Sequence, residues 1–188
     1  MKKLKITFNS PVVLGFLFAS LAVLILGFVT GGASNEMLFM TYHSSLKNPL
    51  TYVRFFTHVL GHSGWAHYIG NASYLLLLGP MLEEKYGSKR ILQVIAITAV
   101  VTALVNYALF WNVALCGASG VVFAFILLTS FTSFKNGEIP LTFILVAIVF
   151  VGQQVYEGLF IQDDISNLSH ILGGIIGAVV GFKLNRKR

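Results

Sequence analysis

The chain alternates between long apolar segments and short polar breaks. Six apolar segments stand out, at about residues 11–33, 66–82, 91–111, 118–134, 140–158 and 165–183. Each is close to the roughly 20 residues that an α-helix needs to cross the hydrocarbon of a bilayer. The pattern therefore predicts an all-α, polytopic membrane protein with six transmembrane helices.

Residues 34–64 follow a different pattern, because they mix aromatic and polar side chains without a spanning segment. Such mixed stretches commonly rest in the membrane interface, so we expect an interfacial loop here. Six spans leave no room for a separate soluble domain, and a single membrane domain over 1–188 is predicted.

Composition supports this interpretation. Apolar residues make up 56% of the 188 residues and charged residues only 11%, too few to give a soluble domain its polar surface. The first apolar run follows three lysines, but it is too long for a typical signal peptide and is interpreted as a retained span.

The net charge of +6 does not indicate nucleic acid binding, because the basic residues collect at the chain ends and in short loops. With both termini in the cytoplasm, eleven of the thirteen basic residues lie on the cytoplasmic side, and Lys47 and Arg54 lie outside. The eleven are Lys2, Lys3, Lys5, Lys85, Lys89, Arg90, Lys135, Lys183, Arg186, Lys187 and Arg188.

A serine and a histidine lie at membrane depth. At 1.5 Å per residue, Ser119 lies roughly 22 Å above the cytoplasmic end of its span and His170 roughly 20 Å. In the second span, His67 lies roughly 22 Å and Asn71 roughly 17 Å above the cytoplasmic end. Their i, i+4 spacing places both on one helix face. Ionisable groups at this depth are costly and usually face a cavity or each other, which indicates a functional site.

These four side chains suit hydrolysis. A serine hydroxyl becomes a nucleophile when a neighbouring base, here His170, takes its proton. Asn71, His67 and the backbone N–H groups at Ser119 offer donors for the oxyanion that attack on a carbonyl creates. Since no acidic residue lies at this depth, a Ser119–His170 dyad is predicted rather than a triad. The single Cys116 excludes an internal disulfide, and no cysteine cluster suggests a metal site.

Glycines accompany both reacting residues. They are Gly117 and Gly120 beside the serine, and Gly173, Gly177 and Gly181 after the histidine. Small residues at four-residue spacing let two membrane helices approach closely, so we expect the fourth and sixth spans to touch.

Together these motifs resemble those of the rhomboid family of intramembrane serine proteases. The resemblance rests on GxSG at 117–120, HxxGxxxG at 170–177, and His62 with HxxxN at 67–71. It extends from about Arg54 to Gly181 and is specific as a set, whereas GxSG alone is weak.

The resemblance implies a rhomboid fold with Ser119 as nucleophile, His170 as general base, and His67, Asn71 and the Ser119 backbone as the oxyanion hole. It also implies substrates that are single-span membrane proteins, cut in the outer part of the span after small residues, without cofactor or metal. A multi-pass protein of a bacterial inner membrane fits the minimal six-span chain. The sequence indicates no oligomeric state.

Two positions depart from the family pattern. Phe123, one turn after Ser119, stands where relatives often carry tyrosine; stacking on His170 is retained, but a phenolic hydrogen bond is not. Ser169 stands where alanine is usual and can hydrogen-bond locally. Neither removes a reacting group, so an effect on rate is expected rather than loss of activity.

Two other function classes fit parts of the sequence. A rhomboid-like pseudoprotease would bind membrane clients without cutting them, but such relatives typically lack the serine or the histidine. A small transporter or channel also places polar groups at membrane depth, yet neither an inverted repeat nor a broken helix pair is visible.

The remaining polar residues outside this set have plainer interpretations. His58 and His62 are expected to anchor the loop by hydrogen bonds, since no third metal ligand accompanies them. Arg54 is expected to be a loop or lipid-headgroup anchor, and Glu83 to pair with a neighbouring lysine or arginine. The Gln153, Gln154 and Glu157 group is interpreted either as the lining of a substrate gate or as polar capping of the fifth span.

Overall fold

The computed structural model describes residues 6–133, 138–160 and 167–185. Within these ranges the regular structure is helical, apart from one isolated bridge between Thr41 and Leu115. The helices are α1 (Pro11–Val29), α2 (Pro49–Thr57), α3 (Trp65–Tyr86), α4 (Ser88–Leu109), α5 (Ser119–Ser130), α6 (Leu141–Phe160) and α7 (Asn167–Asn185), with the short turns η1 (Asn35–Phe39), η2 (His58–Leu60) and η3 (Phe131–Ser133). The predicted all-α class is confirmed.

Helices occupy all six predicted apolar segments. Among the described residues, α1, α4, α6 and α7 are long and apolar enough to cross a membrane, whereas α5 has 12 residues. The number of spans and the side of the termini stay predictions. The end of the fourth predicted span and the start of the sixth lie outside the described ranges. So do seven of the basic residues on which the predicted orientation rests, namely Lys2, Lys3, Lys5, Lys135, Arg186, Lys187 and Arg188.

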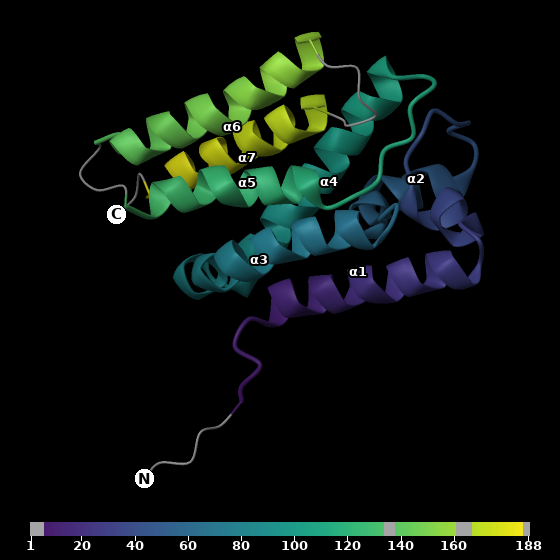
Figure 1. The fold of residues 1–188 in the computed structure, drawn as a ribbon, viewed down its shortest axis with the longest axis horizontal. Helices are drawn as coiled ribbons and strands as arrows, with labels where there is room; N and C mark the ends of the chain where they lie inside the picture. The colour runs from purple at the N-terminus through teal and green to yellow at the C-terminus, as the bar shows by residue number, and fades with distance from the viewer. Residues whose placement is uncertain (1–5, 134–137, 161–166, 186–188) are drawn as a thin grey trace.

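Successive helices of the bundle run in opposite directions, so α3, α5 and α7 all begin at the same end (Figure 1). At the opposite end, the amide of Asn185 donates a hydrogen bond to the hydroxyl of Tyr86 at 2.9 Å. His67, Ser119 and His170 lie in the first turns of their helices. The bundle therefore carries all three toward one end of the molecule.

Helix α5 lies at the centre of the bundle, with eight of its twelve residues buried. Helix α7 packs directly against it. A methyl group added at Gly173 or Gly177 would collide with the backbone carbonyl of Gly120 or Ala124 on α5. The close approach predicted from the glycine spacing is therefore present.

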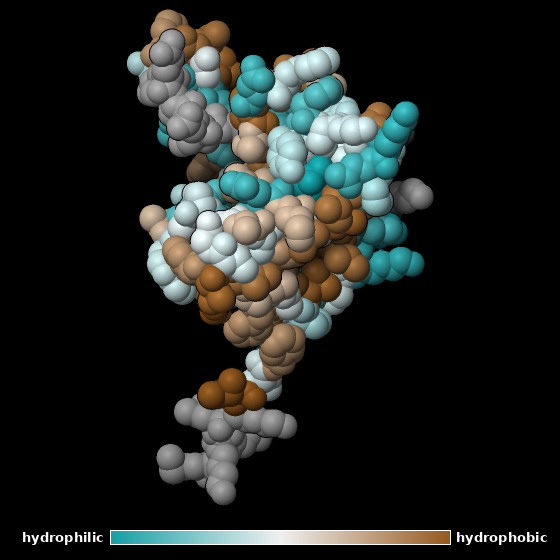
Figure 2. Space-filling view, turned by 90° about the vertical axis from the view of Figure 1, so that its right-hand side faces the viewer, coloured by the Kyte–Doolittle hydropathy of each residue, from teal (hydrophilic) through white to brown (hydrophobic). Residues whose placement is uncertain are grey.

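The outer surface of the bundle is apolar along its length. Leu77 of α3 is 72% exposed and Ile148 of α6 is 63% exposed. Contiguous exposure of large apolar side chains is unusual for a soluble monomer and suits contact with lipid. At the end where α3, α5 and α7 begin, polar residues gather beside apolar ones (Figure 2).

The predicted interfacial loop is folded rather than irregular, because it holds η1, α2 and η2. Pro49 opens α2, and the Asn48 side chain caps it by accepting a hydrogen bond from the Leu50 N–H at 3.0 Å. Its place in the membrane interface stays a prediction.

Arg54 anchors this loop from inside. It is only 3% exposed and donates to the Tyr42 hydroxyl at 3.0 Å and to Ser44 Oγ at 2.8 Å. A buried guanidinium needs several acceptors, and the loop supplies them. Loop anchoring is thus confirmed, while contact with a lipid headgroup is wrong.

Glu83 ties the start of α1 to the end of α3. Its carboxylate accepts hydrogen bonds from Ser10 Oγ at 2.5 Å and from the backbone N–H groups of Val12 and Val13, each at 3.0 Å. The predicted ion pair of Glu83 is wrong, because the first amides of α1 have no helical carbonyl partner and take the carboxylate instead.

Candidate active site

Ser119 is the first residue of α5, and the loop that leads to it is held at two points. Leu115 exchanges two backbone hydrogen bonds with Thr41, at 2.8 and 2.9 Å, and the Gly117 N–H donates to the His58 carbonyl at 2.9 Å. Gly117 has a φ of +119°, a conformation that favours glycine. Ser119 therefore enters α5 where the helix has backbone N–H groups without helical partners.

His67 and Asn71 of α3 lie against this loop. A methyl group added at Gly117 would be 2.6 Å from both Cε1 and Nε2 of His67, and 3.8 Å from Nδ2 of Asn71. Since Gly117 is two residues before Ser119, the imidazole and the amide lie beside the approach to the serine. The structure thus brings together the α3 and α5 residues that the sequence placed at one depth.

The hydrogen-bond partners of His67 decide which ring nitrogen carries its proton. Ser63 approaches Nδ1 with its hydroxyl at 3.1 Å and with its backbone N–H at 3.5 Å. A backbone N–H only donates, so Nδ1 accepts and Nε2 bears the hydrogen in the neutral ring. That Nε2–H, next to Gly117, is available as a donor.

Asn71 is oriented in the same way by His62. The Nδ1 of His62 lies 3.0 Å from the Leu60 carbonyl and so carries the proton, which leaves Nε2 to accept from Asn71 Nδ2 at 3.1 Å. Burial, with the nearby His67 as a further cause, lowers the pKa of His62 to about 4, so His62 stays a neutral acceptor near neutral pH. The amide of Asn71 keeps a second N–H for another partner.

His170 lies in the first turn of α7 and is 8% exposed. Its ring stacks flat on Phe123 of α5, with centroids 4.5 Å apart and an interplanar angle of 2°. A methyl group added at Gly120 would be 3.4 Å from the Ser169 carbonyl oxygen. The Ser119–Gly120 and Ser169–His170 segments are therefore neighbours, although a direct hydrogen bond from the Ser119 hydroxyl to the His170 ring is not among the contacts of the described residues.

Gln154 of α6 supplies a partner of His170 that the sequence did not indicate. Its Oε1 hydrogen-bonds the Nδ1 of His170. The sequence alone leaves Gln154 between gate lining and polar capping, because periodicity does not say which side of a mostly apolar helix faces α7.

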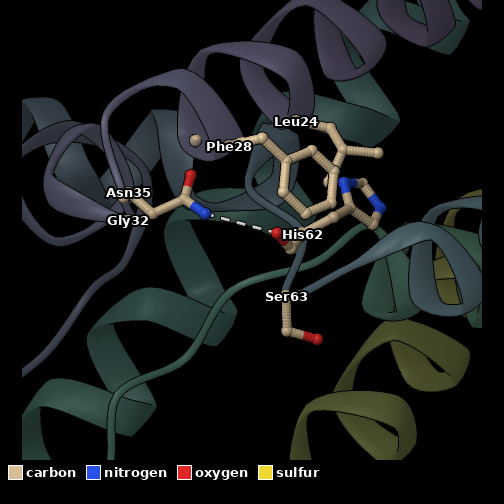
Figure 3. A pocket seen from close by; sticks show the side chains of 8 residues that line it. Leu24, Phe28, Gly32, Asn35, His62 and Ser63 are labelled. Atoms are coloured by element: carbon tan, nitrogen blue, oxygen red, sulfur yellow. Dashed lines mark hydrogen bonds between the residues drawn. The ribbon is translucent and has the colours of Figure 1, made fainter.

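An open hollow of about 230 Å³ lies on the α1 side of His62. Leu24 and Phe28 give it apolar walls, while Asn35, His62 and Ser63 give it polar ones (Figure 3). The Asn35 amide donates to the His62 carbonyl at 3.2 Å. The hollow therefore reaches the residue that orients Asn71.

Comparison with known proteins gives matches over most of the chain. Residues 49–187 match a protein family described as "Rhomboid domain". The chain is 30% identical to "Rhomboid-related protein 1" of Caenorhabditis elegans over 138 residues, which cover 69% of this chain and 39% of that protein. It is 25% identical to "Rhomboid protease GlpG" of Haemophilus influenzae over 156 residues, which cover 80% of each. The chain thus spans well under half of the nematode relative and most of the bacterial one.

Proposed function

The chain belongs to the rhomboid family of intramembrane serine proteases, and we propose that it cleaves single-span membrane proteins with Ser119 as nucleophile and His170 as general base. The stack of His170 on Phe123, one helical turn after Ser119, supports this assignment most directly. The stack holds the imidazole of α7 against α5, one helical turn from the residue proposed as the nucleophile.

The proposed reaction follows the two-step route of serine hydrolases. Ser119 Oγ attacks the carbonyl carbon of the scissile peptide bond while Nε2 of His170 takes the hydroxyl proton. The carbon–nitrogen bond then breaks, and the leaving amine receives that proton. Water next attacks the acyl-serine and gives a proton to His170, which returns it to Ser119 Oγ as the new carboxyl end departs.

The oxyanion is proposed to be held by three donors. These are the second N–H of Asn71, the Nε2–H of His67 and the backbone N–H of Ser119, which also offers the positive end of the α5 dipole. The ring and amide partners of His67 and Asn71 fix these donors before a substrate binds. Preorganised donors of this kind need no rearrangement as the charge develops.

The length of α5 suits a site below the membrane surface. Its twelve residues extend about 18 Å, against a hydrocarbon core of about 30 Å, so its two ends cannot both reach the surface. We propose six spans with cytoplasmic termini and with Ser119 in the outer half. A single domain over 1–188 agrees with the packing of α1 on α3, where the Tyr68 hydroxyl donates to the Leu17 carbonyl at 3.3 Å.

Location in a bacterial inner membrane is proposed from the minimal six-span plan and the similarity to the Haemophilus protein over 80% of both chains. Single-span membrane proteins with small residues before the cut are the proposed substrates, and the reaction needs no cofactor or metal.

A fluorophosphonate probe tests the nucleophile. We expect the folded wild type to be labelled on Ser119, as located by mass spectrometry of the peptides, and Ser119→Ala to remain unlabelled. His170→Ala should lose labelling as well, because the hydroxyl then has no base. Ser130→Ala, at the other end of α5, is the matched control and should label as the wild type does.

Unlabelled folded wild type would instead support a pseudoprotease. Equal labelling of Ser119→Ala and the wild type would show that another serine reacts.

A further inference from the structure

Within the described part of the chain, helix α6 has one buried residue, and that residue is polar. Gln154 alone among its twenty residues is buried, at 6% exposure, and its side chain meets His170 across the α6–α7 contact. Burying an amide inside an apolar bundle is costly unless its polar atoms are paired. The position of Gln154 is therefore coupled to that of the histidine ring.

The direction of the hydrogen bonds around Gln154 is fixed by its neighbour on the same helix. Gln154 Nε2 donates to Glu157 Oε2 at 3.0 Å, and Gln153 Nε2 donates to Glu157 Oε1 at 2.8 Å. A carboxylate only accepts, so the NH₂ group of Gln154 faces Glu157 and its Oε1 faces His170. An amide oxygen also only accepts, so Nδ1 of His170 carries the proton.

This arrangement leaves His170 able to act as a general base. With the proton on Nδ1, the lone pair of the neutral ring is on Nε2, the nitrogen that the proposed reaction requires. Phe123 fixes the plane of the ring, and Gln154 fixes its rotation within that plane. When Nε2 takes the serine proton, the Gln154 oxygen and the charge of Glu157 behind it stabilise the imidazolium.

We propose that Gln154 is a positioning residue for His170, supported by Glu157, so that an amide from α6 takes the place of an orienting acid. This proposal rests on the proposed function of Ser119 and His170. It makes the reactivity of Ser119 depend on α6, the candidate span with the smallest buried share.

Matched variants of α6 test the proposal. Gln154→Met keeps the side-chain length but removes the acceptor. Gln154→Glu, always made together with Glu157→Gln so that a donor rather than a second carboxylate faces it, keeps an acceptor at the same place. Gln153→Met is the control, since Gln153 is exposed and, among the described residues, hydrogen-bonds Glu157 rather than His170. Each folded variant is compared by fluorophosphonate labelling rate, by kcat and KM on a reporter, and by thermal unfolding.

We expect Gln154→Met to lower kcat and the labelling rate roughly 10- to 100-fold, the size of loss seen when a metal-bound imidazole loses its orienting partner. KM should not change, because Gln154 is buried behind the ring. Gln154→Glu should recover most of the loss, and Gln153→Met should stay within about twofold of the wild type.

Wild-type rates in Gln154→Met would overturn the proposal, as would equal losses in Gln154→Met and Gln154→Glu at unchanged stability. If Gln154→Met does not fold, ¹⁵N NMR of the His170 ring in the wild type decides instead. A protonated Nδ1 with an unprotonated Nε2 is expected, and the reverse tautomer would exclude the role of Gln154. Absent labelling of the wild type would count against the proposed function and would leave the tautomer prediction standing.

Discussion

Asn71 and His67 each have one polar group hydrogen-bonded to a neighbouring residue of the protein. Each keeps one N–H donor for a substrate. His62 accepts one N–H of Asn71, and Ser63 donates to Nδ1 of His67. Both side chains are therefore held before the reaction starts, which is the condition under which a donor contributes most to catalysis.

Removing either donor is expected to slow the chemistry. Asn71→Ala or His67→Ala should lower kcat by about 10²- to 10³-fold, the usual cost of one oxyanion donor. Steady-state cleavage of a reporter measures the effect, and Asn112→Ala, in an exposed loop, is the control that should leave kcat unchanged. A double variant of Asn71 and His67 that cuts at the wild-type rate would rule out the proposed oxyanion hole.

At the scale of single residues, the sequence predicts the depth of the reacting residues in the membrane but not their hydrogen-bond partners. Counting along apolar segments needs only the helical rise, so it predicts one level for Ser119 and His170. The contacts of Gln154 and Glu83 depend on how each helix is rotated about its axis and on which backbone groups lack partners. Neither property is encoded in local periodicity.

Among the helices, the contact between α5 and α7 brings the two reacting segments together. Gly173 and Gly177 lie directly on α5 backbone, whereas a methyl group at Gly174 would be 3.6 Å from the Leu127 side chain, an ordinary contact. The positions of Gly173 and Gly177 on α7 therefore tolerate no added methyl group, whereas the neighbouring position of Gly174 does.

Two alanine substitutions on α7, at Gly177 and at Gly174, test this difference in packing. Gly177→Ala should lower stability by about 1–3 kcal/mol, because the methyl group overlaps the Ala124 carbonyl and forces α7 away from α5. Gly174→Ala should be neutral or slightly stabilising, since alanine favours helix over glycine. Thermal unfolding in detergent measures both, and equal shifts for the two variants would contradict the packing described.

Most helices could be predicted from the sequence, because a lipid-spanning helix must be long and apolar. Helix α2 is not predicted by the apolar pattern, because its nine residues are too few for a clear hydrophobic period. Helix α5 ends at Ser130, with η3 following, rather than continuing to residue 134.

Across the whole molecule, the alternating helix directions collect the starts of α3, α5 and α7 at one end, beside a partly polar surface (Figures 1 and 2). The opposite end is tied by Glu83 and Asn185. A far end joined by hydrogen bonds and a polar near end suit a hydrolytic site that needs water while its helices contact lipid.

Cleavage in a bilayer tests the proposed protease most directly. The purified chain and a single-span reporter, with small residues in the outer part of its span, are placed together in proteoliposomes, and the fragments are sized by mass spectrometry. We expect the wild type to cut the reporter at one position in that outer part, and Ser119→Ala to leave it intact. Cleavage by Ser119→Ala at the wild-type rate, or an intact reporter with folded wild type, would contradict the assignment of Ser119 as the nucleophile of a membrane protease.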